Sequence, residues 1–219
     1  MAGPDYYPIF LDLTGRRCLV VGGGSVAEGK VRGLLAAQAD VTVVAPGLTP
    51  ALKALVTTGE ILHREGEYAA GDLEGAELCF VATDDGAINA NVAADARARG
   101  VWVNAADDPA NCDFILPGVV RSGSVVLAAS TGGSSPALAR RLREDLAAFL
   151  DEGYGPLGDL LATVRAEVRA AGQRIDPEAW QRAIDAKLRT LVAQGRIEDA
   201  RQRLRKALGV KPASGDAEK

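Results

Sequence analysis

The sequence predicts an α/β fold: a parallel sheet with helices on its faces, followed by a small β region and a C-terminal helical domain. Short apolar runs typical of buried strands alternate with longer segments in which apolar residues recur at helical spacing. Three consecutive glycines connect the first of these strands to the first helix. Each strand is joined to the next by a connection long enough for a right-handed crossover, which makes neighbouring strands parallel.

Length, composition and charge exclude several classes of protein. A chain of 219 residues, 47% of them hydrophobic, has enough apolar material for one large domain or two small ones. The net charge of −4, with no basic tract ahead of the C-terminal region, argues against a nucleic-acid partner. No apolar run is long enough to span a membrane.

The N-terminus and the cysteines predict a cytoplasmic protein. Residues 1–13 lack the basic and then apolar segments of a signal peptide. The three cysteines, Cys18, Cys79 and Cys112, are far apart and odd in number, so we expect reduced thiols. The single histidine, His63, excludes a His-rich metal site, and its apolar neighbours predict a half-exposed strand residue. We expect no metal site in the protein.

The glycine run predicts a dinucleotide site between strand 18–21 and helix 25–38. Gly22, Gly24 and Ala27 fit the spacing G-x-G-x-x-G/A of Rossmann-type folds. The first glycine permits a tight turn, the second lets the backbone approach a pyrophosphate, and the small third residue lets helix and strand pack closely. The N-terminus of the helix then offers free N–H groups to the phosphates. An ordinary glycine-rich turn is the alternative, and the position of the motif between a strand and a helix favours the dinucleotide.

The remaining elements of the first half follow the same alternation. We expect strands at 41–45, 61–64, 78–83 and 101–103, and helices at 50–58 and 87–99. No acidic residue ends strand 41–45, so the usual partner of the ribose hydroxyl is missing and the choice between NAD and NADP stays open. Thr83 and Asp84 end a buried strand, where they would line a cofactor crevice. Asp84 and Asp85 would alternatively cap the following helix.

The second half departs from the βα pattern. Residues 114–120 and 124–130 are expected to form a hairpin joined by residues 121–123. Its exposed edges and apolar face need a partner, for which a second copy of the chain is the simplest choice. Ser135 is a good N-cap for helix 136–150, and the preceding glycines and hydroxyls suggest an anion-binding turn; a plain capped turn is the alternative. After a linker at 151–156, helices are expected at 157–171, 177–193 and 197–208.

Six motifs together resemble one known family. They occur in the order Pro8-Ile9-Phe10, Val20 to Lys30, Ala82-Thr83-Asp84-Asp85, Val103-Asn104-Ala105-Ala106-Asp107, Phe114-Ile115-Leu116-Pro117 and Ser130 to Arg140. Over residues 6–150 the chain resembles the precorrin-2 dehydrogenase and sirohydrochlorin ferrochelatase family, which includes the dehydrogenase/ferrochelatase part of siroheme synthases. The stretch G-G-x-S-P-x-L-A-R, which ends at Arg140, is the most specific of these motifs.

The resemblance implies a domain organisation and an activity. It implies a Rossmann domain over 1–113, a β dimerisation region with a helix over 114–150 and a helical domain over 151–210, in a homodimer. We expect residues 211–219 to be a disordered tail, and the chain is too short to include the methyltransferase module of some siroheme synthases. The implied reaction is the NAD-dependent oxidation of precorrin-2 to sirohydrochlorin. Some members of the family also insert ferrous iron to give siroheme.

The resemblance also implies the site residues. The essential aspartate of the family falls on Asp107, and a carboxylate there is a reasonable base for the proton that leaves the macrocycle. The implied NAD contacts are Gly22, Gly24, Ser25, Val26, Pro46, Gly47 and Thr83. Asp108 and Asp113 are competing carboxylates, and a structural loop aspartate is the alternative for Asp107. The substrate carries eight carboxylates, which gives Ser134, Ser135 and Arg140 a role in binding it.

Two other functions are weighed against this enzyme. A non-catalytic NAD-sensing module would share the glycine motif, but Asp107 on the crevice side and the hairpin argue against it. A chelatase that has lost its dehydrogenase activity is disfavoured because Gly22, Gly24 and Asp107 are intact.

Overall fold

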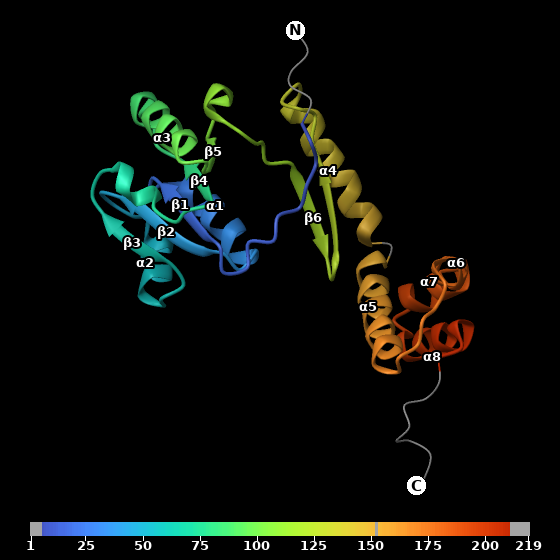
Figure 1. Ribbon diagram of the computed structural model, residues 1–219. Coiled ribbons are helices and arrows are strands. Elements are labelled where there is room, and N and C mark those ends of the chain that lie inside the picture. Colours follow the sequence, from blue (N-terminus) through green and yellow to red (C-terminus); the bar gives the residue numbers. More distant parts are fainter. Residues whose placement is uncertain (1–5, 152, 211–219) are drawn as a thin grey trace. The chain divides into compact units, whose positions relative to one another are not determined.

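The computed structural model describes residues 6–151 and 153–210, and the chain divides into two compact units between Ile115 and Leu116. The first unit contains a five-stranded sheet, and the second contains a hairpin and the helices of the C-terminal half (Figure 1). The expected three-part division of the chain remains a prediction.

The first unit is the predicted parallel sheet with helices on both faces. Its strands are β1 (Arg17–Val21), β2 (Asp40–Ala45), β3 (Leu62–Glu65), β4 (Leu78–Val81) and β5 (Trp102–Ala105), in the spatial order β3-β2-β1-β4-β5. Its α-helices are α1 (Ser25–Ala36), α2 (Pro50–Thr57) and α3 (Gly86–Ala98), and two short 3₁₀ helices cover Ala70–Leu73 and Pro109–Asn111. The strand order reverses direction beside β1, between β2 and β4, and ligands of such folds bind at that point.

Successive residues of the central strands supply two separate cores. Cys18 and Val20 of β1 pack under α1 and α2, while Leu19 and Val21 pack on the opposite face against α3. All four residues of β4 are buried in the same alternating way. Because both faces of these strands are covered, they appear in the sequence as continuous apolar runs.

The second unit begins with a hairpin that is shorter than expected. Strand β6 (Gly118–Ser122) pairs antiparallel with β7 (Val125–Ala129), and Ser122 lies opposite Val125. The connection is therefore Gly123-Ser124, and the expected connection at 121–123 is wrong. Phe114 was expected in this hairpin, but it belongs to the first unit and packs edge-to-face on Phe80 at 5.5 Å.

The helices of the second unit are α4 (Pro136–Asp151), α5 (Tyr154–Ala170), α6 (Pro177–Ala183), α7 (Ala186–Ala193) and α8 (Ile197–Leu208). The expected linker at 151–156 is wrong after Gly153, because α5 starts at Tyr154 and packs on the hairpin turn. A Cβ at Gly155 would lie 2.1 Å from Ser122 Oγ, and the backbone N–H of Ser124 donates to Asp159 Oδ1 at 2.8 Å.

The expected helix 177–193 is two helices, α6 and α7. The helix is interrupted at Asp185, because its Oδ1 accepts a hydrogen bond from the Leu188 N–H at 2.8 Å and so caps α7. The carboxylate also pairs with Arg203 of α8. Apolar residues of α5, α7 and α8, among them Leu160, Leu188 and Leu204, form a third core. The expected tail at 211–219 lies outside the described residues.

Candidate functional site

A cavity of about 630 Å³ lies at the carboxyl ends of β1, β2 and β4. The seven residues expected to contact NAD all line it: Gly22, Gly24, Ser25, Val26, Pro46, Gly47 and Thr83. The wall is completed by further residues from the same strand ends and from the loop after β3: Val21, Gly23, Val44, Ala45, Leu48, Thr49, Gly66, Glu67, Tyr68, Ala82, Asp84 and Ile88. The fold thus places strand ends and a loop that are far apart in the sequence around one cavity.

The three consecutive glycines have three different reasons to lack a side chain. Gly22 has a φ of 118°, and a Cβ there would lie 2.3 Å from the carbonyl oxygen of Ala82. A Cβ at Gly23 would lie 2.0 Å from the carbonyl oxygen of Gly47. Gly24 would meet no atom within 4 Å, so its Cβ position faces open space.

The first turn of α1 is open to a ligand. Gly24 is its N-cap residue and offers no side-chain hydrogen bond to the N–H groups that begin the helix. Ser25 and Val26, which follow it, are exposed and line the cavity. Unpaired N–H groups and the positive end of the helix dipole suit a phosphate at this position.

Neighbouring residues at the end of β4 line the cavity or cap the next helix. Thr83 and Asp84 line the cavity, as one of the two hypotheses expected. Asp85 caps α3, because its Oδ1 accepts hydrogen bonds from the N–H groups of Ala87 at 2.8 Å and Ile88 at 3.2 Å. The hydroxyl of Thr83 donates to Oδ1 of the buried Asn89 at 2.6 Å, which fixes its side chain.

Glu67 and Tyr68 reach the cavity from a loop that the sequence presents only as a polar, irregular stretch. Arg64 orders this loop by pairing with Asp72 and by donating to the carbonyl oxygen of Glu67 at 2.6 Å. The Tyr68 hydroxyl donates to Asp95 at 3.0 Å, and burial raises its pKa. His63, next to this loop, is a partly buried strand residue with Nε2 3.0 Å from the carbonyl oxygen of Ala45, as predicted.

Asp107 lies on the loop after β5 with an exposed side chain and a φ of 58°. Within the described part of the chain, no group donates a hydrogen bond to its carboxylate, so it does not form the structural Asx-turn. The competing carboxylates are engaged: Asp108 accepts from Asn111 Nδ2 at 2.7 Å, and Asp113 accepts from the Val103 N–H at 3.0 Å and from Arg97 at 2.9 Å. Asp107 is not among the residues that line the cavity.

The turn before α4 belongs to the second unit, and both of its predicted serine hydroxyls make hydrogen bonds within it. Ser135 Oγ accepts from the Leu138 N–H at 3.2 Å, which confirms the predicted cap. Ser134 Oγ donates to the carbonyl oxygen of Thr131 at 2.7 Å. Arg140 is exposed and pairs with Glu144 at 3.2 Å, one helical turn further on.

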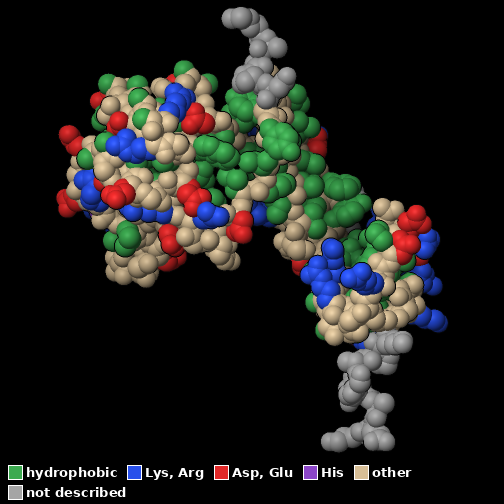
Figure 2. Space-filling model, viewed as in Figure 1, with side chains coloured by type: hydrophobic (Ala, Val, Ile, Leu, Met, Phe, Trp, Pro, Cys, Tyr) green, Lys and Arg blue, Asp and Glu red, His purple; other side chains and the backbone are tan. Residues whose placement is uncertain are grey.

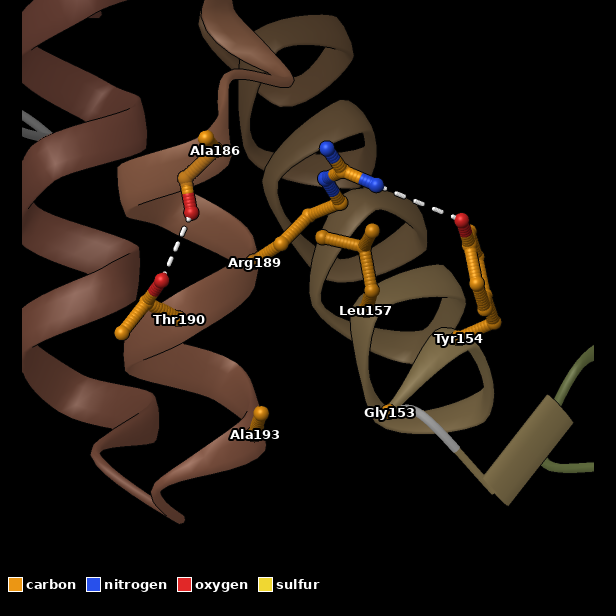
Figure 3. A pocket seen from close by; sticks show the side chains of 7 residues that line it. All are labelled: Gly153, Tyr154, Leu157, Ala186, Arg189, Thr190 and Ala193. Carbon is orange, nitrogen blue, oxygen red and sulfur yellow. Dashed lines mark hydrogen bonds between the residues drawn. The ribbon is translucent and has the colours of Figure 1, made fainter. Parts of the chain in front are cut away.

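A second cavity, of about 260 Å³, lies between α5 and α7 (Figure 3). Its lining residues are Gly153, Tyr154, Leu157, Ala186, Arg189, Thr190 and Ala193. The guanidinium of Arg189 extends past Leu157 and donates to the Tyr154 hydroxyl at 3.3 Å (Figure 3). The lining holds no carboxylate, thiol or histidine and none of the predicted site residues, so we assign it no chemistry.

The described residues contain neither a cluster of metal ligands nor a helix that could cross a membrane. Across residues 6–151 and 153–210, no three His, Cys, Asp or Glu side chains gather into a group that would hold a metal ion. None of the helices in this described part is both long and apolar enough to cross a membrane.

Comparison with known proteins identifies the family. Residues 9–118 match the family model described as putative NAD(P)-binding. The solved structure of SirC, a precorrin-2 dehydrogenase, superposes with a TM-score of 0.75 at 30% sequence identity, over 92% of this chain and all of the SirC chain. The chain belongs to the precorrin-2 dehydrogenase family.

Members of this family also occur within longer siroheme synthases. The siroheme synthase of Chromobacterium violaceum is 39% identical over 98% of this chain, and that of Methylococcus capsulatus is 42% identical over 93% of it. The aligned region covers 45% and 43% of those two relatives, so the chain spans less than half of their length.

Proposed function

We propose that this protein oxidises precorrin-2 to sirohydrochlorin with NAD as the hydride acceptor. The observation that carries the proposal is the free carboxylate of Asp107, placed at the same edge of the sheet as the glycine-lined cavity. Neighbouring acids are occupied by structural hydrogen bonds, whereas Asp107 has none among the described residues. A carboxylate left without an internal partner is available to a substrate.

The residues around the cavity fit a dinucleotide. The open space at Gly24 and the uncapped first turn of α1 would receive the pyrophosphate, with Ser25 and Val26 supplying N–H groups. Pro46, Gly47 and Thr83 would contact the remainder of the cofactor. When bound, NAD supplies a nicotinamide ring that accepts a hydride. Because β2 ends without an acid, the acidic candidates for a ribose hydroxyl are Glu67 and Asp84, the two carboxylates that line the cavity.

Asp107 would perform the proton chemistry of the dehydrogenation. The oxidation removes two hydrogens from the macrocycle: one leaves with its electron pair as hydride, and the other leaves as a proton. The carboxylate of Asp107 would take the proton, and its exposure lets it return the proton to water after the reaction. We propose the same residue as the proton acceptor for any insertion of ferrous iron, which requires the pyrrole protons to leave.

The second unit would bind the anionic substrate and a second copy of the chain. Arg140 and the turn with Ser134 and Ser135 would face substrate carboxylates. Ser134 already donates its hydroxyl hydrogen to Thr131, whereas the oxygen of Ser135 accepts and leaves its hydrogen to donate, so Arg140 and Ser135 would supply the attraction. Exposed apolar side chains gather over the hairpin and α4 (Figure 2), namely Leu116, Val119, Leu138, Leu142 and Phe149. Such a patch, together with hairpin edges that no other described strand pairs with, favours a homodimer.

We also propose a cytoplasmic location. All three cysteines are free thiols, and Cys18 and Cys79 are fully buried. This is the usual state of cysteine in a reducing compartment.

Turnover tests the proposed reaction directly. The purified protein is mixed with precorrin-2 and NAD, and then separately with sirohydrochlorin and ferrous or cobaltous ion, while absorbance follows the macrocycle and NADH. We expect NADH and sirohydrochlorin to appear in equal amounts. Binding of NAD without any oxidation of precorrin-2 would instead identify a nucleotide-sensing module.

A further inference from the structure

The loop after β3 brings an acid to the wall of the cofactor cavity beside β2. Glu65, the last residue of β3, lies opposite Ala45, the last residue of β2, in the parallel register. The N–H of Gly66 then donates to the carbonyl oxygen of Ala45 at 3.2 Å. Glu67 is the next residue, and it lines the cavity as Pro46 does. Glu67 therefore follows directly on a contact with the end of β2.

The end of β2 is the place from which Rossmann-type folds recognise the adenosine ribose. In those folds an acid about 20 residues after the glycine turn accepts a hydrogen bond from the ribose hydroxyl. Here Ala45, Pro46 and Gly47 occupy that place, and the neighbouring strand supplies the acid. Asp84 also lines the cavity, but it follows β4, which lies on the other side of β1 from β2. The strand order thus favours Glu67 over Asp84 as the partner of the adenosine ribose.

The main chain at Glu67 is held on both sides. Its carbonyl oxygen accepts a hydrogen bond from Arg64 at 2.6 Å, and Arg64 also pairs with Asp72. The hydroxyl of Tyr68, the next residue, donates to Asp95 of α3 at 3.0 Å. The carboxylate of Glu67 makes no hydrogen bond or ion pair with any described residue, so it is available to a ligand. An acceptor on an ordered main chain loses less entropy when it binds.

The cavity wall offers no cation to an additional phosphate. Among the described residues that line it, none is Lys, Arg or His, and the charged side chains are those of Glu67 and Asp84. Arg64 is not part of the wall, and its guanidinium is already paired with Asp72. NADP differs from NAD by a phosphate on the 2′-hydroxyl of the adenosine ribose. That phosphate replaces a hydrogen-bond donor with negative charge, which a carboxylate repels.

We propose that Glu67 selects NAD over NADP: its carboxylate accepts a hydrogen bond from the adenosine 2′-hydroxyl and repels a 2′-phosphate. The loop after β3 thus supplies the acid that β2 lacks. This inference rests on the proposed function, because it names the residue that recognises the cofactor of that reaction.

Calorimetric titration with NAD and with NADP tests the proposal by binding alone. The quantity compared is the selectivity ratio, the Kd for NADP divided by the Kd for NAD. We expect the wild type to bind NAD more tightly, and Glu67→Gln to lower the ratio by about tenfold or more, because NAD loses a charged acceptor and NADP loses a repulsion. Glu67→Lys adds a cation for the 2′-phosphate and should lower the ratio further.

Two variants serve as matched controls. Glu65→Gln removes the same charge two residues earlier, at an exposed side chain outside the cavity wall. Asp84→Asn removes the other carboxylate of the wall. We expect both to keep the wild-type ratio. An equal fall in Glu65→Gln would reflect net charge, and a fall confined to Asp84→Asn would assign the ribose to the β4 side. Either result overturns the proposal, as does an unchanged ratio in Glu67→Gln.

The same titrations separate this inference from the proposed function, since they need no precorrin-2. A protein that shows the expected ratios but never oxidises precorrin-2 supports the role of Glu67 and refutes the reaction. A wild type that oxidises precorrin-2 but binds both nucleotides equally well refutes the role of Glu67 alone. A wild type that binds neither nucleotide overturns both.

Discussion

The two units of the chain bury their apolar residues to very different extents. Every residue of β4 in the first unit is buried, whereas no residue of β6 or β7 in the second unit is. The parallel sheet is covered on both faces by helices of its own unit, so its core is complete without a partner. The hairpin consists of only two strands, and its apolar side chains remain partly exposed beside those of α4.

This difference indicates which unit carries the chemistry and which carries association. A self-contained sheet holds strand ends and glycine turns rigidly, which suits a cofactor site and a reacting carboxylate. A half-covered hairpin and an amphipathic helix suit association, because the missing cover must come from elsewhere. Substitutions in the first unit should therefore change chemistry without changing assembly, and some substitutions in the second should do the reverse.

The largest expected effect follows from Gly24→Asp in the first unit. The new side chain enters open space and leaves the fold intact, but it places a negative charge where the pyrophosphate would lie. We expect NAD binding and dehydrogenation to be lost, and any ferrous ion insertion and the dimer to persist. Isothermal titration with NAD measures the loss, and Gly24→Ala is the uncharged control. Wild-type NAD affinity in Gly24→Asp would show that the glycine run is not the phosphate site.

Asp107→Ala should reduce dehydrogenation by about 10²-fold or more, the usual size of a lost general base. NAD affinity and dimer mass should hardly change, because Asp107 does not line the cavity. Any insertion of ferrous iron should be lost together with the dehydrogenation. The matched control is Asp108→Ala, which removes an adjacent carboxylate that already binds Asn111. Oxidation of precorrin-2 by Asp107→Ala at the wild-type rate would falsify the assignment of the base.

Leu142→Glu in the second unit should weaken assembly without changing the cofactor site. Leu142 is exposed on α4, and in a homodimer a charge there would be buried against the second copy. We expect the dissociation constant of the dimer to rise by about tenfold or more, with NAD affinity unchanged. Sedimentation at micromolar concentration gives the mass. Ile197→Glu on α8 is the control, and a monomeric wild-type protein would contradict the dimer itself.

The smallest effects concern two equivalent helix caps, one in each unit. Ser135→Ala and Thr49→Ala each remove a side chain that accepts an N–H from the first turn of a helix, at 3.2 Å and 3.3 Å. Each should lower the free energy of unfolding by about 1 kcal/mol. Thermal unfolding with and without NAD separates the effects of the two variants, because NAD should raise the unfolding temperature of the first unit only. A Ser135→Ala protein with unchanged stability would show that this hydrogen bond does not stabilise α4.

Features that depend on neighbouring residues could be predicted from the sequence. The glycine turn, the Thr49 and Ser135 caps and the alternating order of strands and helices follow from local backbone chemistry, and the structure agrees with them closely. The strand end predicted Thr83 in a cofactor crevice, and the family resemblance implied Pro46 and Gly47 there; all three line one cavity, because parallel strands bring their carboxyl ends to the same edge.

Contacts between distant segments show which of several similar residues are free to act. The family resemblance singled out Asp107, but the sequence offers no physical reason to prefer it to Asp108 or Asp113; their hydrogen bonds supply one. Gly23 is required by a carbonyl oxygen of Gly47, and Lys30 meets an amide that lies 74 residues further along the chain. Such contacts depend on how crossovers place distant segments, and the linear spacing of residues does not record those distances.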